Sequence, residues 1–306
     1  MGHSHARTHS PSLTASHRSR LVVVMGLTLT VLVVQLVGAA LSNSLALLAD
    51  AGHMLTDVAG VSLALLAITL ANRPASPRRT FGYYRLEILA ALANAVLLIG
   101  VALWVLVEAL DRLQNPPDVA AGTMLLFALV GLAANLVGII LLRGGADSSL
   151  NIKGAYLEVL GDALGSLLAA SAAVVIMATG WLRADAVGSI LVALLILPRA
   201  WLLVRDAVDV LLEASPKNVD LDAVRRHILD TPGVVGTHDL HVWTITSGMP
   251  VLASHVVVDD AVIAEGRSGH VLDDLTACLA DHFAVEHCTF QIEPQGHAHH
   301  EAPTHH

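Results

Sequence analysis

Six long apolar stretches follow one another along this chain, and they constrain its fold more than any other feature of the sequence. They span residues 21–41, 46–71, 84–110, 119–142, 154–179 and 184–212. A helix needs roughly twenty mainly apolar residues to cross a hydrocarbon core about 30 Å thick, and each stretch meets that length. Charged residues make up only 14% of the chain, against about 25% in a typical soluble protein. The sequence therefore predicts a membrane protein with an all-α six-helix transmembrane bundle.

The distribution of Lys and Arg around these stretches predicts their orientation. With the N-terminus inside, the cytoplasmic segments hold Arg7, Arg18, Arg20, Arg73, Arg78, Arg79, Arg143 and Lys153. The opposite side holds only Arg112 and Arg183. Short cytoplasmic loops carry an excess of Lys and Arg in membrane proteins. We therefore expect a multi-pass protein of the cell membrane with both termini cytoplasmic.

After the sixth stretch, the composition changes to that of a soluble domain. Helical periodicity at 218–230 is followed by strand-like runs at 234–246 and 251–259, a helix at 267–283 and a strand at 286–293. This order is typical of a small two-layer α+β domain. We therefore divide the chain into a His-containing cytoplasmic tail (1–20), a transmembrane domain (21–213), a cytoplasmic domain (214–294) and a His-rich tail (295–306). The tails could bind metal weakly or only aid solubility.

Four ionisable residues lie within the apolar stretches at matched spacing. His53 and Asp57 are four residues apart in the second stretch, and Glu158 and Asp162 are four apart in the fifth. Each pair lies on one face of its helix. If the two helices are antiparallel neighbours, the pairs lie at nearly the same depth. Because an ionisable group in hydrocarbon is costly without a partner, a cavity or an ion, the pattern indicates a metal site with four ligands.

Hydrogen bonds between helices, or pairing with Arg, would be the other explanation. The first five stretches contain no Lys or Arg at comparable depth, so cationic partners are scarce. Three carboxylates that lie close together repel one another unless they are protonated or bridged by a cation. Asp50 lies off this line, and ligation and a solvated vestibule position are equally compatible with it. Gln35, Asn94 and Asn135 are interpreted as packing hydrogen bonds.

These residues lie in segments that resemble the cation diffusion facilitator family, in its bacterial zinc/cadmium/cobalt efflux branch. The similar segments are SLALLADAGHMLTD (44–57), TFGYYRLEILA (80–90), GAYLEVLGDALGS (154–166) and HDLHVW (238–243). The resemblance implies six spans, a ferredoxin-like cytoplasmic domain, a homodimer, and exchange of a divalent metal for protons by alternating access. It also implies that His53, Asp57 and Asp162 are ligands of the transported metal.

Glu158 departs from the family pattern, in which zinc-type sites usually have His at this position. One imidazole with three carboxylates favours oxygen-loving ions more than a nitrogen-rich site does. Zn²⁺ tolerates carboxylates and stays the leading cargo, with Mn²⁺, Fe²⁺, Co²⁺ or Cd²⁺ as alternatives. The expected partners are divalent metal ions, protons, membrane lipid and a second copy of the chain. No prosthetic group is expected, and nucleic acid is disfavoured because no strongly basic face appears.

The resemblance also implies that the cytoplasmic domain binds regulatory metal. His238, His255, His270 and Glu293 stand at matching positions and are tentative ligands, with His241, His287 and Gln291 as weaker candidates. A single His on a short strand is more often a surface or core residue than a ligand, and Gln291 is a poor ligand. Cys278 and Cys288 are interpreted as small apolar residues rather than ligands.

An enzyme and a metal sensor are the two alternatives to a transporter. An intramembrane protease would show His-Glu-x-x-His and a di-iron oxidase repeated Glu-x-x-His, and the sequence contains neither. It also lacks the Gly-rich phosphate loop of an ATP-driven pump. The chain is therefore predicted not to be an enzyme, and a metal sensor without transport remains the alternative.

Overall fold

The computed structural model describes residues 15–71, 73–74, 76–143, 150–283, 285 and 287–297. Most of the tail predicted at 1–20, and the His-rich tail beyond residue 297, lie outside these described residues. The chain divides into two compact units. The helical unit comprises Met1–Ser62 and Ala93–Leu202, and the C-terminal unit comprises Leu63–Leu92 and Leu203–His306.

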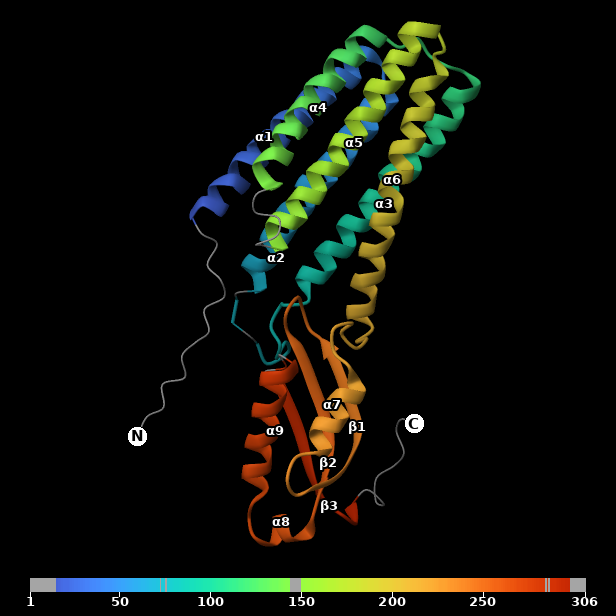
Figure 1. The fold of residues 1–306 in the computed structure, drawn as a ribbon. Helices are drawn as coiled ribbons and strands as arrows, with labels where there is room; N and C mark the ends of the chain where they lie inside the picture. Colours follow the sequence, from blue (N-terminus) through green and yellow to red (C-terminus); the bar gives the residue numbers. More distant parts are fainter. Residues whose placement is uncertain are drawn as a thin grey trace. The chain divides into compact units, whose positions relative to one another are not determined.

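Six long helices account for the six apolar stretches (Figure 1). They are α1 (Ala15–Ser42), α2 (Leu45–Ala71), α3 (Leu86–Gln114), α4 (Ala121–Arg143), α5 (Leu150–Thr179) and α6 (Arg183–Leu211). Each is long and apolar enough to cross a membrane. Their largest difference from the predicted spans is at the start of α1, which begins at Ala15 rather than at residue 21. The prediction of an all-α six-helix membrane part is confirmed.

Small residues line the contacts among α2, α4 and α5 in the helical unit. Ala46, Ala128 and Ala169 are fully buried together with the larger side chain of Met124. A Cβ added at Gly138 of α4 would lie 2.9 Å from a methyl group of Val159 in α5. Membrane helices associate through such close packing, because lipid gives apolar side chains no reason to cluster.

The N-terminus of α2 is capped by a residue from a different helix. The buried Asp185 carboxylate in α6 accepts hydrogen bonds from the backbone N–H groups of Leu45 and Ala46, at 2.8 and 3.1 Å. It also accepts one from the Ser44 hydroxyl at 2.6 Å. These bonds satisfy donors that a helix leaves unpaired at its start. Asp185 thereby ties the beginning of α2 to α6, although nothing in the local sequence around residue 45 indicates it.

The C-terminal unit contains a small α+β domain whose elements follow the predicted order. They are α7 (Leu221–Leu229), β1 (Val234–Thr244), β2 (Pro250–Val258), α8 (Asp260–Ala264), α9 (Ser268–Phe283) and β3 (His287–Pro294). Only the short helix α8 was not predicted. The sheet has the order β1-β2-β3, with β1 antiparallel to β2 and β2 parallel to β3. The prediction of a small α+β domain is confirmed.

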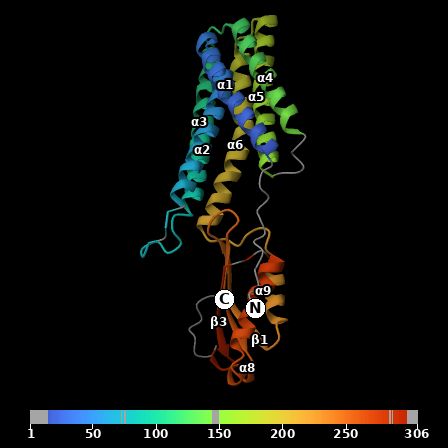
Figure 2. The same cartoon turned by 90° about the vertical axis from the view of Figure 1, so that its left-hand side faces the viewer.

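Helices α7 and α9 cover one face of this sheet (Figures 1 and 2). Val256 of β2 and Ile292 of β3 pack in the core between the sheet and these helices. Side chains alternate between the two faces along a strand. His255 and Glu293, each next in sequence to one of these core residues, therefore belong to the face away from α7 and α9.

Candidate metal site in the membrane-spanning helices

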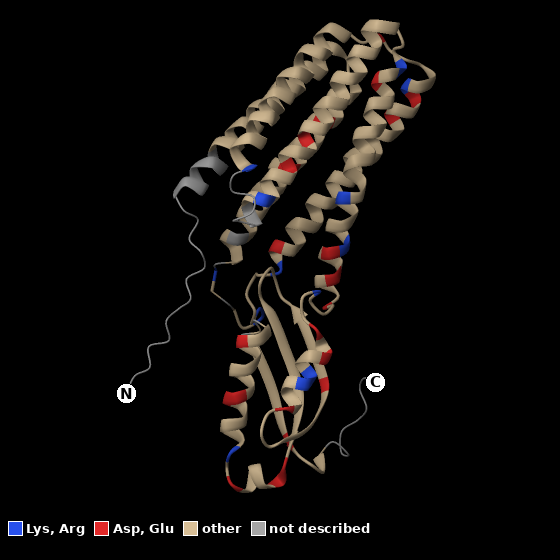
Figure 3. Cartoon of the chain, viewed as in Figure 1, with Lys and Arg blue, Asp and Glu red and all other residues tan. Residues whose placement is uncertain are grey.

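Ionisable residues of α2 and α5 face one another inside the helical unit. His53 and Asp57 lie one turn apart on α2, and Glu158 and Asp162 lie one turn apart on α5. Acidic positions within α5 stand out against a ribbon that is otherwise largely uncharged (Figure 3). The structure brings the four residues together, as the antiparallel arrangement of the two helices predicted.

His53 is the centre of this group. Its Nδ1 lies 3.4 Å from Oδ2 of Asp57, and its Nε2 lies 3.8 Å from Oδ1 of Asp162 and 3.9 Å from Oε1 of Glu158. His53, Asp57 and Asp162 each offer one ligand atom, and these atoms all lie within 4.8 Å of one another. Ligands of one Zn²⁺ ion lie about 2.0–2.2 Å from it. Small side-chain movements would therefore suffice to enclose an ion.

Three atoms of this cluster are buried without a hydrogen-bond partner. They are Nδ1 of His53, Oδ2 of Asp57 and Oδ1 of Asp162. His53 is only 6% exposed and Asp162 only 2%. Buried polar atoms are almost always hydrogen-bonded, and buried charges are normally paired or bound to metal. A cation among these atoms would supply the partner that each of them lacks, so the residues present fit a metal.

Glu158 differs from the other three residues because it already has a cationic partner. Arg199 of α6 donates to its Oε2 in an ion pair, and the Glu158 side chain is 33% exposed. The expected scarcity of cationic partners concerned only the first five spans. Arg199 is a residue of the sixth span, directly after Pro198. Glu158 is therefore shared between the cluster and a fixed positive charge.

Asp50 lies outside the cluster, in a separate buried network. Its Oδ2 accepts hydrogen bonds from Gln35 Nε2 at 2.6 Å and from Ser166 Oγ at 3.1 Å. Asp50 is 1% exposed, so of the two positions left open for it, the structure shows neither a solvated vestibule position nor membership of the cluster. A Cβ at Gly165 would collide with the Asp50 carboxylate. The small residue at position 165 thus makes room for a polar side chain of α2.

A second cluster lies on the sheet of the C-terminal domain. The Glu293 carboxylate lies 2.7 Å from His255 Nδ1. It also accepts hydrogen bonds from His238 Nε2 at 3.1 Å and from the Gln291 side-chain amide at 2.8 Å. Burial raises the pKa of the Glu293 carboxyl, but the hydrogen bond from His238 and the nearby His255 outweigh it, and the pKa is lowered overall. The structure thus brings together three of the four tentative ligands. His270 lies on α9 and is exposed, outside this cluster.

The chain has six helices long and apolar enough to cross a membrane, a buried histidine–carboxylate cluster between α2 and α5, and a small α+β domain. These features define a multi-pass membrane protein with a candidate metal site. The chain matches the family model of the cation efflux transmembrane domain over residues 21–212. It matches that of the cation efflux protein cytoplasmic domain over residues 216–295.

Full-length relatives match nearly the whole chain. The metal cation efflux system protein CzcD of Cupriavidus metallidurans is 46% identical over 96% of this chain and 90% of its own length. The zinc transporter ZitB of Escherichia coli is 42% identical over 96% of this chain and 93% of its own length. A cadmium, cobalt and zinc/H(+)-K(+) antiporter of Bacillus subtilis is 39% identical over 98% of this chain and 94% of its own length. The chain therefore belongs to the cation efflux family, which is a family of transporters.

Proposed function

We propose that this chain exports divalent metal ions, with Zn²⁺ as the main cargo, in exchange for protons. The observation that carries the proposal is the cluster of His53, Asp57 and Asp162, whose ligand atoms lie within 4.8 Å of one another. One buried atom of each residue has no hydrogen-bond partner. Relatives named as a zinc transporter and as a cadmium, cobalt and zinc antiporter support the same reading.

The proposed exchange follows from what the ligands need in order to bind a metal. An imidazole ligand must be neutral and a carboxylate ligand ionised, so metal binding expels protons from these groups. Protons that reach the cluster from the other side of the membrane then compete for the same atoms and release the metal. Alternating access of one site to two solutions is sufficient to couple the two flows.

The choice of cargo depends on the role of Glu158. Its Oε1 lies 3.9 Å from His53 Nε2, and its Oε2 is held by Arg199. With that pair intact, the metal is offered one imidazole and two carboxylates, and a fourth position stays open. If Glu158 joins as the fourth ligand, the site is harder and more negative, which favours Mn²⁺, Fe²⁺ or Co²⁺. Cd²⁺ is the further alternative, because cadmium is named in the antiporter relative.

The proposed assembly is a homodimer in the cell membrane with both termini on the cytoplasmic side. The excess of Lys and Arg in alternate loops supports the orientation. The match of residues 216–295 to the cytoplasmic domain of cation efflux proteins also supports it. In this arrangement His238, His255 and Glu293 form a regulatory metal site on the cytoplasmic side. The same cluster would serve a metal sensor that does not transport, which is the alternative function.

Uptake by proteoliposomes tests the proposal. Purified protein is reconstituted in vesicles, a pH gradient is imposed, and entry of Zn²⁺, Cd²⁺, Co²⁺, Fe²⁺ and Mn²⁺ is followed separately. We expect gradient-dependent Zn²⁺ entry that Asp57→Ala and Asp162→Ala each abolish. Asp206→Asn, which removes an exposed carboxylate of α6, should leave it intact. Metal binding without uptake would favour the sensor, and uptake by either Ala variant would refute the site.

A further inference from the structure

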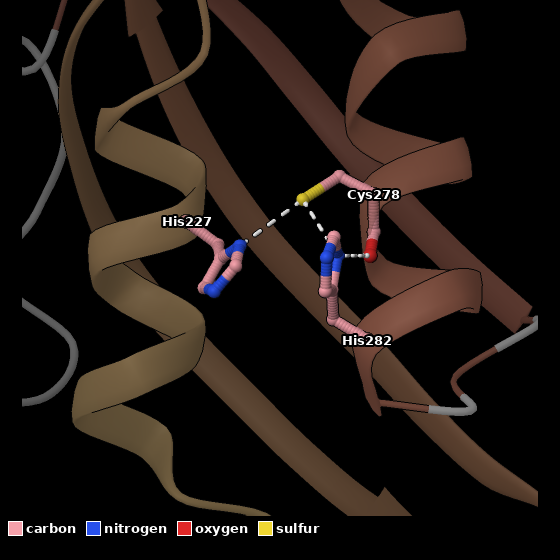
Figure 4. Close-up of side chains that lie close together, drawn as sticks. All are labelled: His227, Cys278 and His282. Atoms are coloured by element: carbon pink, nitrogen blue, oxygen red, sulfur yellow. Dashed lines mark hydrogen bonds between the residues drawn. The ribbon is translucent and has the colours of Figure 1, made fainter.

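Three metal-ligating side chains meet between the two helices of the C-terminal domain. His227 comes from α7, and Cys278 and His282 come from α9 (Figure 4). His227 Nδ1 lies 3.3 Å from Cys278 Sγ, and His282 Nδ1 lies 3.7 Å from the same sulfur. The two imidazole rings are tilted against each other with centroids 4.8 Å apart. The sulfur is thus flanked by imidazoles from both helices.

These separations suit one tetrahedral ion. Zn–S bonds of about 2.3 Å and Zn–N bonds of about 2.0–2.1 Å place sulfur and nitrogen about 3.6 Å apart around the ion. The observed distance from Cys278 Sγ to His227 Nδ1, 3.3 Å, is close to that value. One ligand atom from each residue can be chosen so that all three lie within 4.8 Å of one another.

Contacts within the domain fix the orientation of both imidazole rings. His282 Nδ1 lies 2.9 Å from the carbonyl oxygen of Cys278, one turn earlier in α9. Donation from Nδ1 to this carbonyl leaves the lone pair on Nε2, and metal-ligating histidines commonly have their second nitrogen fixed in this way. The His227 ring also rests on the ring of Phe283, edge to face, at 5.1 Å. Binding of an ion would therefore need little further ordering of these two side chains.

The surroundings allow a cation to enter and to be held. His282 is exposed, and His227 and Cys278 are half-buried. Burial, together with the carboxylates of Asp281 and Asp230, raises the pKa of the Cys278 thiol. A bound metal would therefore displace the thiol proton into solvent. The same two carboxylates give this part of the domain a negative potential that favours a cation.

We propose that His227, Cys278 and His282 form a further metal site, which binds a borderline or soft divalent cation such as Zn²⁺, Cd²⁺ or Co²⁺. The thiolate disfavours Mg²⁺ and Mn²⁺, which prefer oxygen ligands. Three protein ligands leave a fourth position for water or another donor. The ion joins α7 to α9 across the outer side of the domain. The cluster of Glu293 lies on the opposite face of the sheet, so the two sites bind independently.

The chemistry of this site gives it a signal that the other two clusters found among the described residues cannot produce. Cys278 and Cys288 are the two cysteines of the sequence, and neither belongs to the cluster of His53 or that of Glu293. Titration of the purified full-length protein with Co²⁺ should therefore produce a thiolate-to-cobalt absorption band in the near ultraviolet. Cys288→Ser should keep the band and Cys278→Ser should lose it. His227→Gln should raise the dissociation constant for Co²⁺, measured from the intensity of this band, by at least about tenfold.

Alkylation of the unmodified protein tests the same site without any substitution. Excess Zn²⁺ should protect Cys278 from iodoacetamide and leave the rate at Cys288 unchanged, with both sites read by mass spectrometry. The proposal is overturned if no band forms, if the band follows Cys288, or if Zn²⁺ does not slow alkylation of Cys278. Circular dichroism of each variant shows whether it is folded. The test is separate from the transport proposal, because it reads binding in the C-terminal domain and not uptake.

Discussion

Arg199 in α6 forms an ion pair with Glu158 in α5, one helical turn from Asp162. The other carboxylate oxygen of Glu158 lies 3.9 Å from His53 Nε2. Glu158 thus connects a fixed positive charge with the cluster of His53, Asp57 and Asp162. At the position where the family resemblance implies an imidazole, this chain has a carboxylate that is partly neutralised from the neighbouring helix.

Replacing Arg199 by Gln should strengthen metal binding at the cluster. Without the guanidinium, both oxygens of Glu158 become available to the metal, and a nearby positive charge is removed. A hydrogen bond to a charged group is worth about 1.5 kcal/mol, so we expect the dissociation constant for Zn²⁺ to fall about tenfold. Calorimetry on the detergent-solubilised protein measures it. Arg199→Lys keeps the charge and should bind as the original does. Weaker Zn²⁺ binding in Arg199→Gln would contradict this prediction and would show that Arg199 helps to hold the ligands in place.

Replacing Glu158 by His should shift selectivity towards Zn²⁺ and Cd²⁺. The change adds a second imidazole and removes one negative charge, which disfavours Mn²⁺. We expect the ratio of Zn²⁺ to Mn²⁺ uptake to rise by about tenfold, as changes around a metal commonly produce. Competition uptake in proteoliposomes gives this ratio directly. Glu158→Gln removes the charge without adding an imidazole and separates the two causes. An unchanged ion preference in Glu158→His would exclude Glu158 from the transport site.

The sequence was sufficient for the local parts of this site and not for its tertiary part. The apolar length of each stretch predicted its helix, and the spacing of four between His53 and Asp57 placed them on one face. Arg199 of α6 lies beside Glu158 of α5 because the two helices pack together, and no local sequence pattern predicts that packing. The same holds for Asp185, which caps a helix far away in the sequence.

Cys278 of the C-terminal domain likewise has one neighbour that the sequence predicts and one that only the fold brings close. Cys278 and His282 are four residues apart on α9, and this spacing was available from the sequence. Their partner His227 lies on α7, and only the packing of both helices on one sheet face brings it to 3.3 Å from the sulfur. Interpreting Cys278 as a small apolar residue therefore missed its polar neighbours.

Removal of the Asp185 carboxylate should destabilise the start of α2 and thereby the helix that carries His53. Asp185→Ala leaves the N–H groups of Leu45 and Ala46 without their acceptor. The loss of a helix cap costs about 1–2 kcal/mol. We expect a lower midpoint of thermal unfolding in detergent. Below that temperature, the ratio of Zn²⁺ to Mn²⁺ uptake should be unchanged. Asp185→Asn retains an acceptor oxygen and should lose less. Equal midpoints for Asp185→Ala and the original protein would contradict the capping role.

Adding a methyl group at Gly165 should also destabilise the helical unit. A Cβ there would lie 3.0 Å from Cγ of Asp50, whose carboxylate is held by Gln35 and Ser166. Overpacking of this kind costs about 1–3 kcal/mol. Gly100→Ala in α3 is the matched control, because a Cβ there meets nothing within 4 Å. The unfolding midpoint should fall only in Gly165→Ala, and Asp50→Ala should relieve part of that loss. A fall of the same size in both glycine variants would contradict the steric explanation.

Zinc should protect the strand that carries Glu293 from hydrogen exchange. His238 and His255 both contact the Glu293 carboxylate, so binding requires only that the ion enter between groups that already lie together. At a Zn²⁺ concentration one hundred times the dissociation constant, a site present only in the folded domain adds about 2.7 kcal/mol. The amides of β3 that exchange by unfolding of the domain should therefore slow by about a hundredfold. Exchange mass spectrometry on the full-length protein resolves this segment.

Two variants decide which ligands produce that protection. Glu293→Ala removes the carboxylate on which both imidazoles converge, and zinc should then slow exchange in β3 only by what the site of Cys278 contributes. Cys278→Ser leaves this carboxylate in place and should preserve the effect on β3, since Cys278 belongs to the helices on the other face of the sheet. If Glu293→Ala kept the protection and Cys278→Ser lost it, zinc would act on the sheet through α7 and α9. The cluster of Glu293 would then be a structural ion-pair network, stable because its buried carboxylate is already paired with two imidazoles.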